Sequence, residues 1–169
     1  MATNLEFITS IESGSAVTTF SVDNIFTAKY DVYMLNLNLK GGGSVLQNVM
    51  GRLIDTGGSV ISTSTYDYAN LDLPAGSAFG ENKGTNLTAW QNMLIMQSNF
   101  GNSSNLYIFN PFDSSSYTFA KDQSTNAKPA FQGRKNIYVE KTAQSYRGIQ
   151  FVANSGNFSN LAVSVYGVK

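Results

Sequence analysis

Short runs in which apolar and polar residues alternate recur along the chain and constrain its fold more than any other feature. The clearest run spans residues 31–39, where one set consists of Tyr33, Leu35, Leu37 and Leu39. A period of two places such a set on one face of a β-strand. The alternate positions are half polar, which predicts a strand with one buried and one wetter face.

The last two dozen residues carry the same pattern twice, around a turn. Residues 146–152 and 159–168 are predicted strands, and the Asn-Ser-Gly-Asn run at 154–157 tolerates the backbone of a tight connection. We expect these two strands to form a closing β-hairpin, with the last strand inside a sheet.

Other segments fall into strands, turns and one ambiguous stretch. Strands are predicted at 5–11, 17–22, 45–54, 59–68, 105–112, 117–120 and 130–140. Loops or turns are predicted at 40–44, 71–85, 100–104 and 122–128, where Gly, Pro, Ser and Asn gather. Residues 86–97, around Trp90, fit either a helix or a strand.

This spacing of strands and turns indicates one all-β domain over residues 1–169. About 8–10 short strands form an antiparallel β-sandwich or barrel, with room for one short helix at 86–97. No repeat or boundary divides the chain.

The composition excludes several classes of function. The 169 residues include no cysteine and no histidine, which removes disulfides, thiolate chemistry, Ser-His triads and His-ligated metals. Charged residues make up 13% and the formal net charge is zero, so no electrostatic argument favours nucleic acid or an anionic membrane. No run of about 18 apolar residues predicts a membrane span.

Carboxylate chemistry has one weak candidate. Asp67 and Asp72 lie close together in the sequence, and with Asn70 they could offer oxygen ligands to calcium. We interpret them as solvated carboxylates, since no calcium-loop, phosphate-loop or nucleophile-elbow motif occurs. The sequence therefore predicts a protein without enzymatic activity, metal or cofactor.

Aromatic residues are the better candidates for binding. The side chains that could contact a glycan or a protein partner are Trp90, Tyr66, Tyr68, Tyr107 and Phe109.

The second strand faces also carry large apolar residues. We expect the following to point outward: Val32, Met34, Tyr107, Phe109, Tyr138 and Tyr166. A two-layer sandwich buries one face of each sheet, so these residues need another cover, either neighbouring subunits or the segments 71–85 and 86–97 of the same chain.

Four stretches, taken in order, resemble a known family. They are Tyr30–Leu37, with its Tyr-Asp-x-Tyr start; 53–59 with 64–69; 106–119, with Asn110-Pro111; and the closing 149–151, 155–157 and 165–169, which ends in Tyr-Gly-Val-Lys. The chain is similar to small β-rich virion structural proteins of tailed bacteriophages, common among phages of marine bacteria and cyanobacteria.

The resemblance implies a jelly-roll-like sandwich displayed on a virion. It leads us to expect a capsid decoration (cement) protein that contacts major capsid or tail proteins and forms a homotrimer. The alternative is a receptor-binding module at a tail or fibre tip that recognises a host surface glycan. Because no long N-terminal shaft precedes the strands, we expect a free-standing virion protein. The resemblance implies no catalytic residues.

Overall fold

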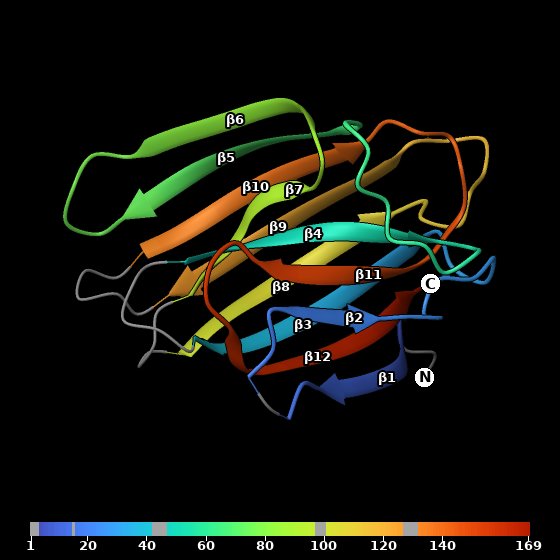
Figure 1. The fold of residues 1–169 in the computed structure, drawn as a ribbon, viewed down its shortest axis with the longest axis horizontal. Coiled ribbons are helices and arrows are strands. Elements are labelled where there is room, and N and C mark those ends of the chain that lie inside the picture. Colours follow the sequence, from blue (N-terminus) through green and yellow to red (C-terminus); the bar gives the residue numbers. More distant parts are fainter. Residues whose placement is uncertain (1–3, 15, 42–46, 97–100, 127–131) are drawn as a thin grey trace.

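Twelve antiparallel strands in two face-to-face sheets form the described part of the molecule (Figure 1). The structure is a computed structural model, and it describes residues 4–14, 16–41, 47–96, 101–126 and 132–169. These residues contain no helix, and so none that is long and apolar enough to cross a membrane. The predicted all-β sandwich is confirmed, with more strands than the 8–10 expected.

The larger sheet has eight strands and the smaller has four. The larger runs in the order β1 (Leu5–Glu12), β12 (Phe158–Val168), β3 (Val32–Gly41), β8 (Gly101–Phe109), β9 (Thr118–Asn126), β10 (Gln132–Glu140), β5 (Tyr66–Pro74) and β6 (Gly80–Leu87). The smaller runs in the order β2 (Thr19–Val22), β11 (Tyr146–Ala153), β4 (Gln47–Asp55) and β7 (Trp90–Met96).

The pairing of strands is nested, as in a jelly roll. β1 pairs with β12, β2 with β11, β3 with β8, and β4 with β7, and these pairs belong alternately to the larger and the smaller sheet. Eight strands wound in this way over two sheets make the jelly-roll architecture. The remaining pairs, β5–β6 and β9–β10, extend the larger sheet beyond β8.

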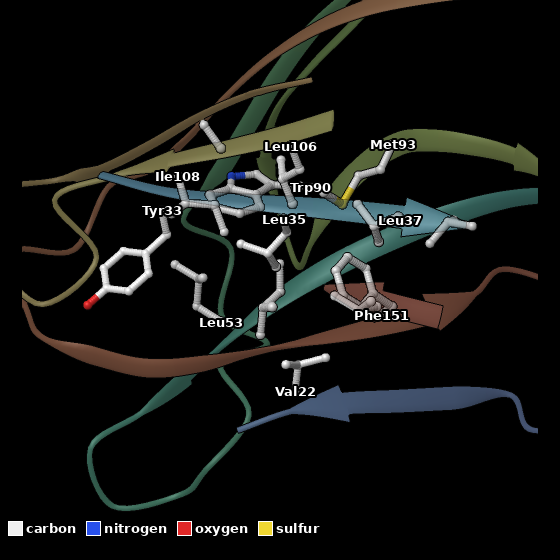
Figure 2. Packing of buried hydrophobic residues seen from close by; sticks show 14 of the residues in the cluster. Val22, Tyr33, Leu35, Leu37, Leu53, Trp90, Met93, Leu106, Ile108 and Phe151 are labelled. Carbon is white, nitrogen blue, oxygen red and sulfur yellow. The ribbon is translucent and has the colours of Figure 1, made fainter. Parts of the chain in front are cut away.

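The core lies between the sheets and is centred on β3. Tyr33, Leu35 and Leu37 are at most 1% exposed, as their alternation predicted. Figure 2 shows them opposite Leu53 and Phe151 of the smaller sheet. Burying each large apolar side chain contributes about 1.5–3 kcal/mol, so this interior layer is the main stabilising element.

The closing strands are correct as strands but wrong as a hairpin. β11 pairs with β2 and β4 in the smaller sheet, whereas β12 pairs with β1 and β3 in the larger. The connection at 154–157 therefore crosses from one layer to the other. Alternation identifies each buried face, but it does not identify the neighbouring strand. The last strand does lie inside a sheet, as predicted.

Three predicted loops are largely strands. Residues 71–85 form the end of β5, a short connection and most of β6; residues 101–104 belong to β8 and 122–126 to β9. In β6 and in these parts of β8 and β9 nearly every residue is polar or glycine, so no alternation of apolar and polar residues reveals them. The ambiguous stretch around Trp90 is a strand. Most of the expected connection at 40–44, and the end of the one at 122–128, lie outside the described residues.

Residues that carry the family resemblance hold one end of the sandwich together. A Cβ at Gly167 would lie 2.5 Å from the ring of Tyr30, so only glycine allows this close approach. Asn110, at a φ of 54°, donates its backbone N–H to the carbonyl of Asp31 at 2.7 Å. The Pro111 carbonyl accepts the N–H of Tyr146 at 2.7 Å. Within this chain these motif residues have structural roles.

Candidate interaction face

The smaller sheet packs against one face of the larger sheet (Figure 1). We call the opposite face of the larger sheet its outer face. β9 shows the division most clearly: Thr118, Ala120, Asp122, Ser124 and Asn126 are buried, and the four residues between them are exposed. The neighbouring strands alternate in the same way. Every second residue of these strands therefore belongs to the outer face.

Register aligns the outward side chains in rows that run across the strands. Two neighbouring rows form what we call the apolar band: Leu5, Phe7, Val32, Met34, Tyr107, Phe109, Phe119, Ile137, Val139, Tyr166 and Val168. Exposure is high at Ile137 (64%), Phe7 (59%) and Phe119 (46%). The band thus places large apolar side chains in contact with solvent from β1 to β10.

A hollow of about 510 Å³ opens within the apolar band. Its lining includes Phe109, Phe119, Ile137 and Val139, with Ala69 of β5 beside them. Such a recess can receive an apolar side chain from another molecule.

The other half of the outer face is polar. Two further rows, here called the polar rows, consist of Ser10, Ser164, Asn36, Asn105, Gln123 and Lys135, and of Glu12, Asn38, Ser103 and Thr125. Asn36 Nδ2 donates to Asn105 Oδ1 at 2.8 Å, and the hydroxyls of Ser103 and Thr125 lie 3.2 Å apart. The outer face of the larger sheet is therefore apolar toward one end of its strands and polar toward the other end.

A polar groove of about 670 Å³ lies where the polar rows meet the apolar band. Lys121 and Lys135 contribute to its lining, together with Asn36, Gln123 and Tyr107. They are the only charged residues among the outward side chains that the structure describes on β3, β8, β9 and β10. The Lys121 ammonium nitrogen lies 5.4 Å from the centroid of the Tyr107 ring.

The predicted binding aromatics divide between core and surface. Trp90 and Tyr66 are fully buried, so they are not available to stack on a ligand. Tyr66 accepts the N–H of Leu53 and donates to the carbonyl of Ile61, both inside the fold. Tyr68 is partly buried and accepts a hydrogen bond from Asn92 Nδ2 at 3.2 Å.

Tyr107 and Phe109 lie on the outer face, as expected, together with Val32, Met34 and Tyr166. The expectation for Tyr138 is wrong. Tyr138 is 3% exposed and points into the sandwich, whereas its neighbour Ile137 points outward. Both residues are apolar, so the alternation at 137–140 did not reveal which face was buried. The alternative cover within the chain also fails, because β5 and β6, which contain most of residues 71–85, extend the larger sheet, and β7 belongs to the smaller one.

The carboxylates Asp67 and Asp72 do not face one another. They lie five positions apart on β5, so their side chains project from opposite faces of the sheet. Asp67 pairs with Lys141 at 2.9 Å, and Asp72 pairs with Arg134 between the sheets. In the described part of the chain, no group of three or more acidic side chains is placed to hold a metal ion.

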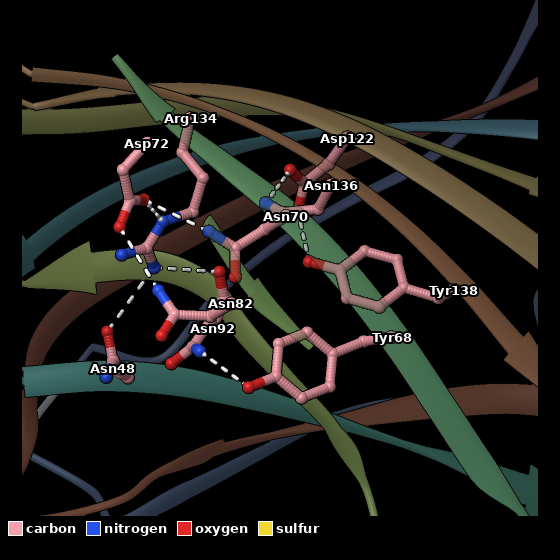
Figure 3. A network of polar contacts seen from close by, with 10 residues as sticks. All are labelled: Asn48, Tyr68, Asn70, Asp72, Asn82, Asn92, Asp122, Arg134, Asn136 and Tyr138. Atoms are coloured by element: carbon pink, nitrogen blue, oxygen red, sulfur yellow. Dashed lines mark hydrogen bonds and ion pairs between the residues drawn. The ribbon is translucent and has the colours of Figure 1, made fainter. Parts of the chain in front are cut away.

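Behind the groove, a buried polar network occupies the inner face of β5, β9 and β10 (Figure 3). Arg134 binds Asp72 and donates to the Asn92 carbonyl at 2.9 Å. Asp122 accepts hydrogen bonds from Asn136 Nδ2 and, at 3.0 Å, from the Tyr138 hydroxyl. Burial raises the pKa of Asp122 to about 7, although both hydrogen bonds and Arg134 favour its charged form.

Sequence reasoning missed several residues of the outer face, namely Phe7, Phe119, Lys121, Lys135 and Ile137. Each lies in a short or largely polar run, and the residues of such a run do not indicate which strands lie beside it. Only the strand register brings them together, so the sequence offers no local signal for them.

Comparison with known proteins found no matching family model, no matching curated protein and no matching solved structure.

Proposed function

We propose that this chain is a structural protein of a phage virion, a capsid decoration protein that binds other subunits through its outer face. The observation that supports this proposal is the apolar band. The sequence resemblance points to the same class of protein, and it supplies the virion as the location and major capsid or tail proteins as partners.

The composition of the apolar band suits a contact between proteins. Monomeric proteins rarely expose a contiguous apolar patch of more than a few hundred Å². The band includes Phe119, Tyr107 and Met34, residue types that are enriched at protein interfaces. A net charge of zero adds no long-range repulsion between copies.

Self-association is part of the proposal. A homotrimer is the assembly that the resemblance implies. In a closed ring of three copies each copy makes the same contacts, so the apolar band of no copy is left uncovered. The hollow beside Phe119 and Ile137 offers a recess for a side chain of the neighbouring copy.

The experiment compares two variants of the purified protein. Phe119→Ser with Ile137→Ser removes two exposed apolar side chains that line the hollow in the band, whereas Phe79→Ser removes a phenylalanine outside the band that is even more exposed (69%). Both proteins, and the unchanged chain, are measured by light scattering and by binding to virions stripped of the protein.

We expect the unchanged chain and the Phe79 variant to form trimers and bind particles, and the double variant to be a monomer that does not bind. Equal assembly and binding by all three proteins would reject the apolar band as the contact surface. A virion copy number of only a few, confined to the tail, would reject the decoration role.

A second candidate function is receptor recognition at a tail or fibre tip. The polar rows favour it, because amides, hydroxyls and the Tyr107 ring together provide the contacts that a sugar requires. A glycan array probed with the purified protein separates this function from capsid decoration.

A further inference from the structure

We propose that the polar groove binds an acidic oligosaccharide, one whose sugar residues carry carboxylates. The inference rests on the second candidate function, glycan recognition, and it names the ligand class and the side chains that would hold it. The groove shares Tyr107 and Ile137 with the apolar band, but its lysine and amide side chains are not members of the band.

The charge of the groove specifies an anionic ligand. Lys121 and Lys135 lie diagonally across β9 and β10, since Lys121 is opposite Ile137 and Lys135 is opposite Gln123. Diagonal neighbours on adjacent strands are about 7–8 Å apart, so both ammonium groups can reach one ligand. Neither lysine forms an ion pair within the described part of the chain. Asp122 also contributes to the groove lining, but it is buried and its oxygens accept hydrogen bonds from Asn136 and Tyr138.

The remaining groups suit the hydroxyls of a sugar. Asn105 uses its oxygen to accept from Asn36, which leaves its Nδ2 free to donate toward the groove. The Gln123 amide, between Asn105 and Lys135 in the same row, has no hydrogen bond to another described residue. This row therefore presents both donors and acceptors, as a ligand with many hydroxyls needs.

An aromatic ring borders the row on one side. Tyr107 lies one row away, with the Lys121 ammonium near its face. A tyrosine ring can pack against the C–H face of a pyranose while the adjacent cation binds its carboxylate. Two cations alone would hold any small anion, whereas cations, amides and a ring in one groove select a charged sugar.

The charge is too small for nucleic acid. Nucleic-acid sites gather several lysine and arginine residues along the phosphate backbone, and this chain has no net positive charge. A row of amides with one flanking ring also lacks the successive stacking platforms of a single-strand binder.

The test measures binding by calorimetry or NMR titration at low salt, with four probes. They are an oligogalacturonate, a neutral malto-oligosaccharide of the same length, sodium sulfate and a single-stranded oligonucleotide. The variants are Lys135→Gln and Lys121→Gln. The matched control is Lys83→Gln, which removes an exposed lysine from β6, outside the groove.

We expect the oligogalacturonate to bind at least tenfold more tightly than the other three probes, and its affinity to fall as salt rises. Each groove variant should weaken this binding about tenfold, and Lys83→Gln should leave it unchanged. Backbone amide shifts should map to β8, β9 and β10.

Other results overturn the inference in distinguishable ways. Equal binding of the neutral sugar would reject the acidic ligand while retaining glycan recognition. No binding of either sugar at millimolar concentration would reject both, and the trimer and virion measurements would still decide the decoration role separately. Equal binding of sulfate or of the oligonucleotide would overturn the inference, because the groove would then be an anion-binding site without selectivity for sugars.

Discussion

Replacing Asp122 with asparagine should remove most of the pH dependence of folding between pH 5 and pH 8. The chain has no histidine, so few side chains titrate in this range. Among carboxyls with displaced pKa values, those of Glu6, Asp23, Asp67 and Asp113 are lowered and so titrate in acid. Burial raises only the pKa of Asp122 into the window, to about 7.

The sign follows from the direction of the shift. A carboxyl whose pKa is higher in the folded state binds more protons there, so its contribution to stability is complete below the unfolded pKa near 3.8 and is lost as pH rises through about 7. At 1.36 kcal/mol per pH unit, the loss between pH 5 and pH 8 is on the order of 2 kcal/mol. Asparagine keeps the shape and remains neutral, and its oxygen can still accept from Asn136.

The assay is urea unfolding at pH 5, 6, 7 and 8, with tryptophan fluorescence as the signal that reports unfolding. The unchanged protein should become less stable across this range, whereas Asp122→Asn should be nearly flat and should be the more stable of the two at pH 8. Parallel pH profiles for the two proteins would refute the reasoning, because they would show that the Asp122 carboxyl does not titrate in this window.

Three further predictions concern packing and assembly. Leu35→Ala, at a fully buried position, should cost about 2–5 kcal/mol in the free energy of unfolding measured with urea. Gly167→Ala should lower stability by about 1–3 kcal/mol, because the added methyl group displaces the Tyr30 ring; a gain in melting temperature would contradict this contact. Phe119→Ser with Ile137→Ser should change the unfolding free energy of the monomer by less than about 1 kcal/mol, and it should abolish the trimer that we propose and that light scattering would detect.

The all-β class was predictable because β3 and β12 combine strict alternation with one fully buried face. Leu35 and Leu37, and likewise Val163 and Val165, are recognisable as core residues from their spacing alone. Alternation is a property of a single strand, so it does not require knowledge of the neighbours.

Features that depend on neighbouring strands were not predictable. β11 and β12 belong to different sheets although a turn-like run joins them. Gly84 lies within β6, where the Tyr68 ring of the neighbouring strand occupies the space that a side chain would need. At 137–138 two large residues that can both be buried are adjacent, and the contacts that Tyr138 makes inside the sandwich, with Trp90 and with Asp122, come from other strands.

The candidate site was predictable only in part. Tyr107 and Phe109 were correctly expected on an outward face, whereas Trp90 and Tyr66 are core residues. Large aromatic residues pack inside more readily than they form exposed platforms. The apolar band arises from register across six strands and the polar groove from register across four, which no local pattern encodes.

The most direct test of the proposed function is an electron-microscopy reconstruction, at side-chain resolution, of the phage virion that we propose carries this protein. The account predicts copies of this jelly roll at symmetry-related capsid sites, with Phe119 and Ile137 buried against a neighbouring subunit. A reconstruction in which both side chains face solvent, while another surface makes the contacts, would contradict it.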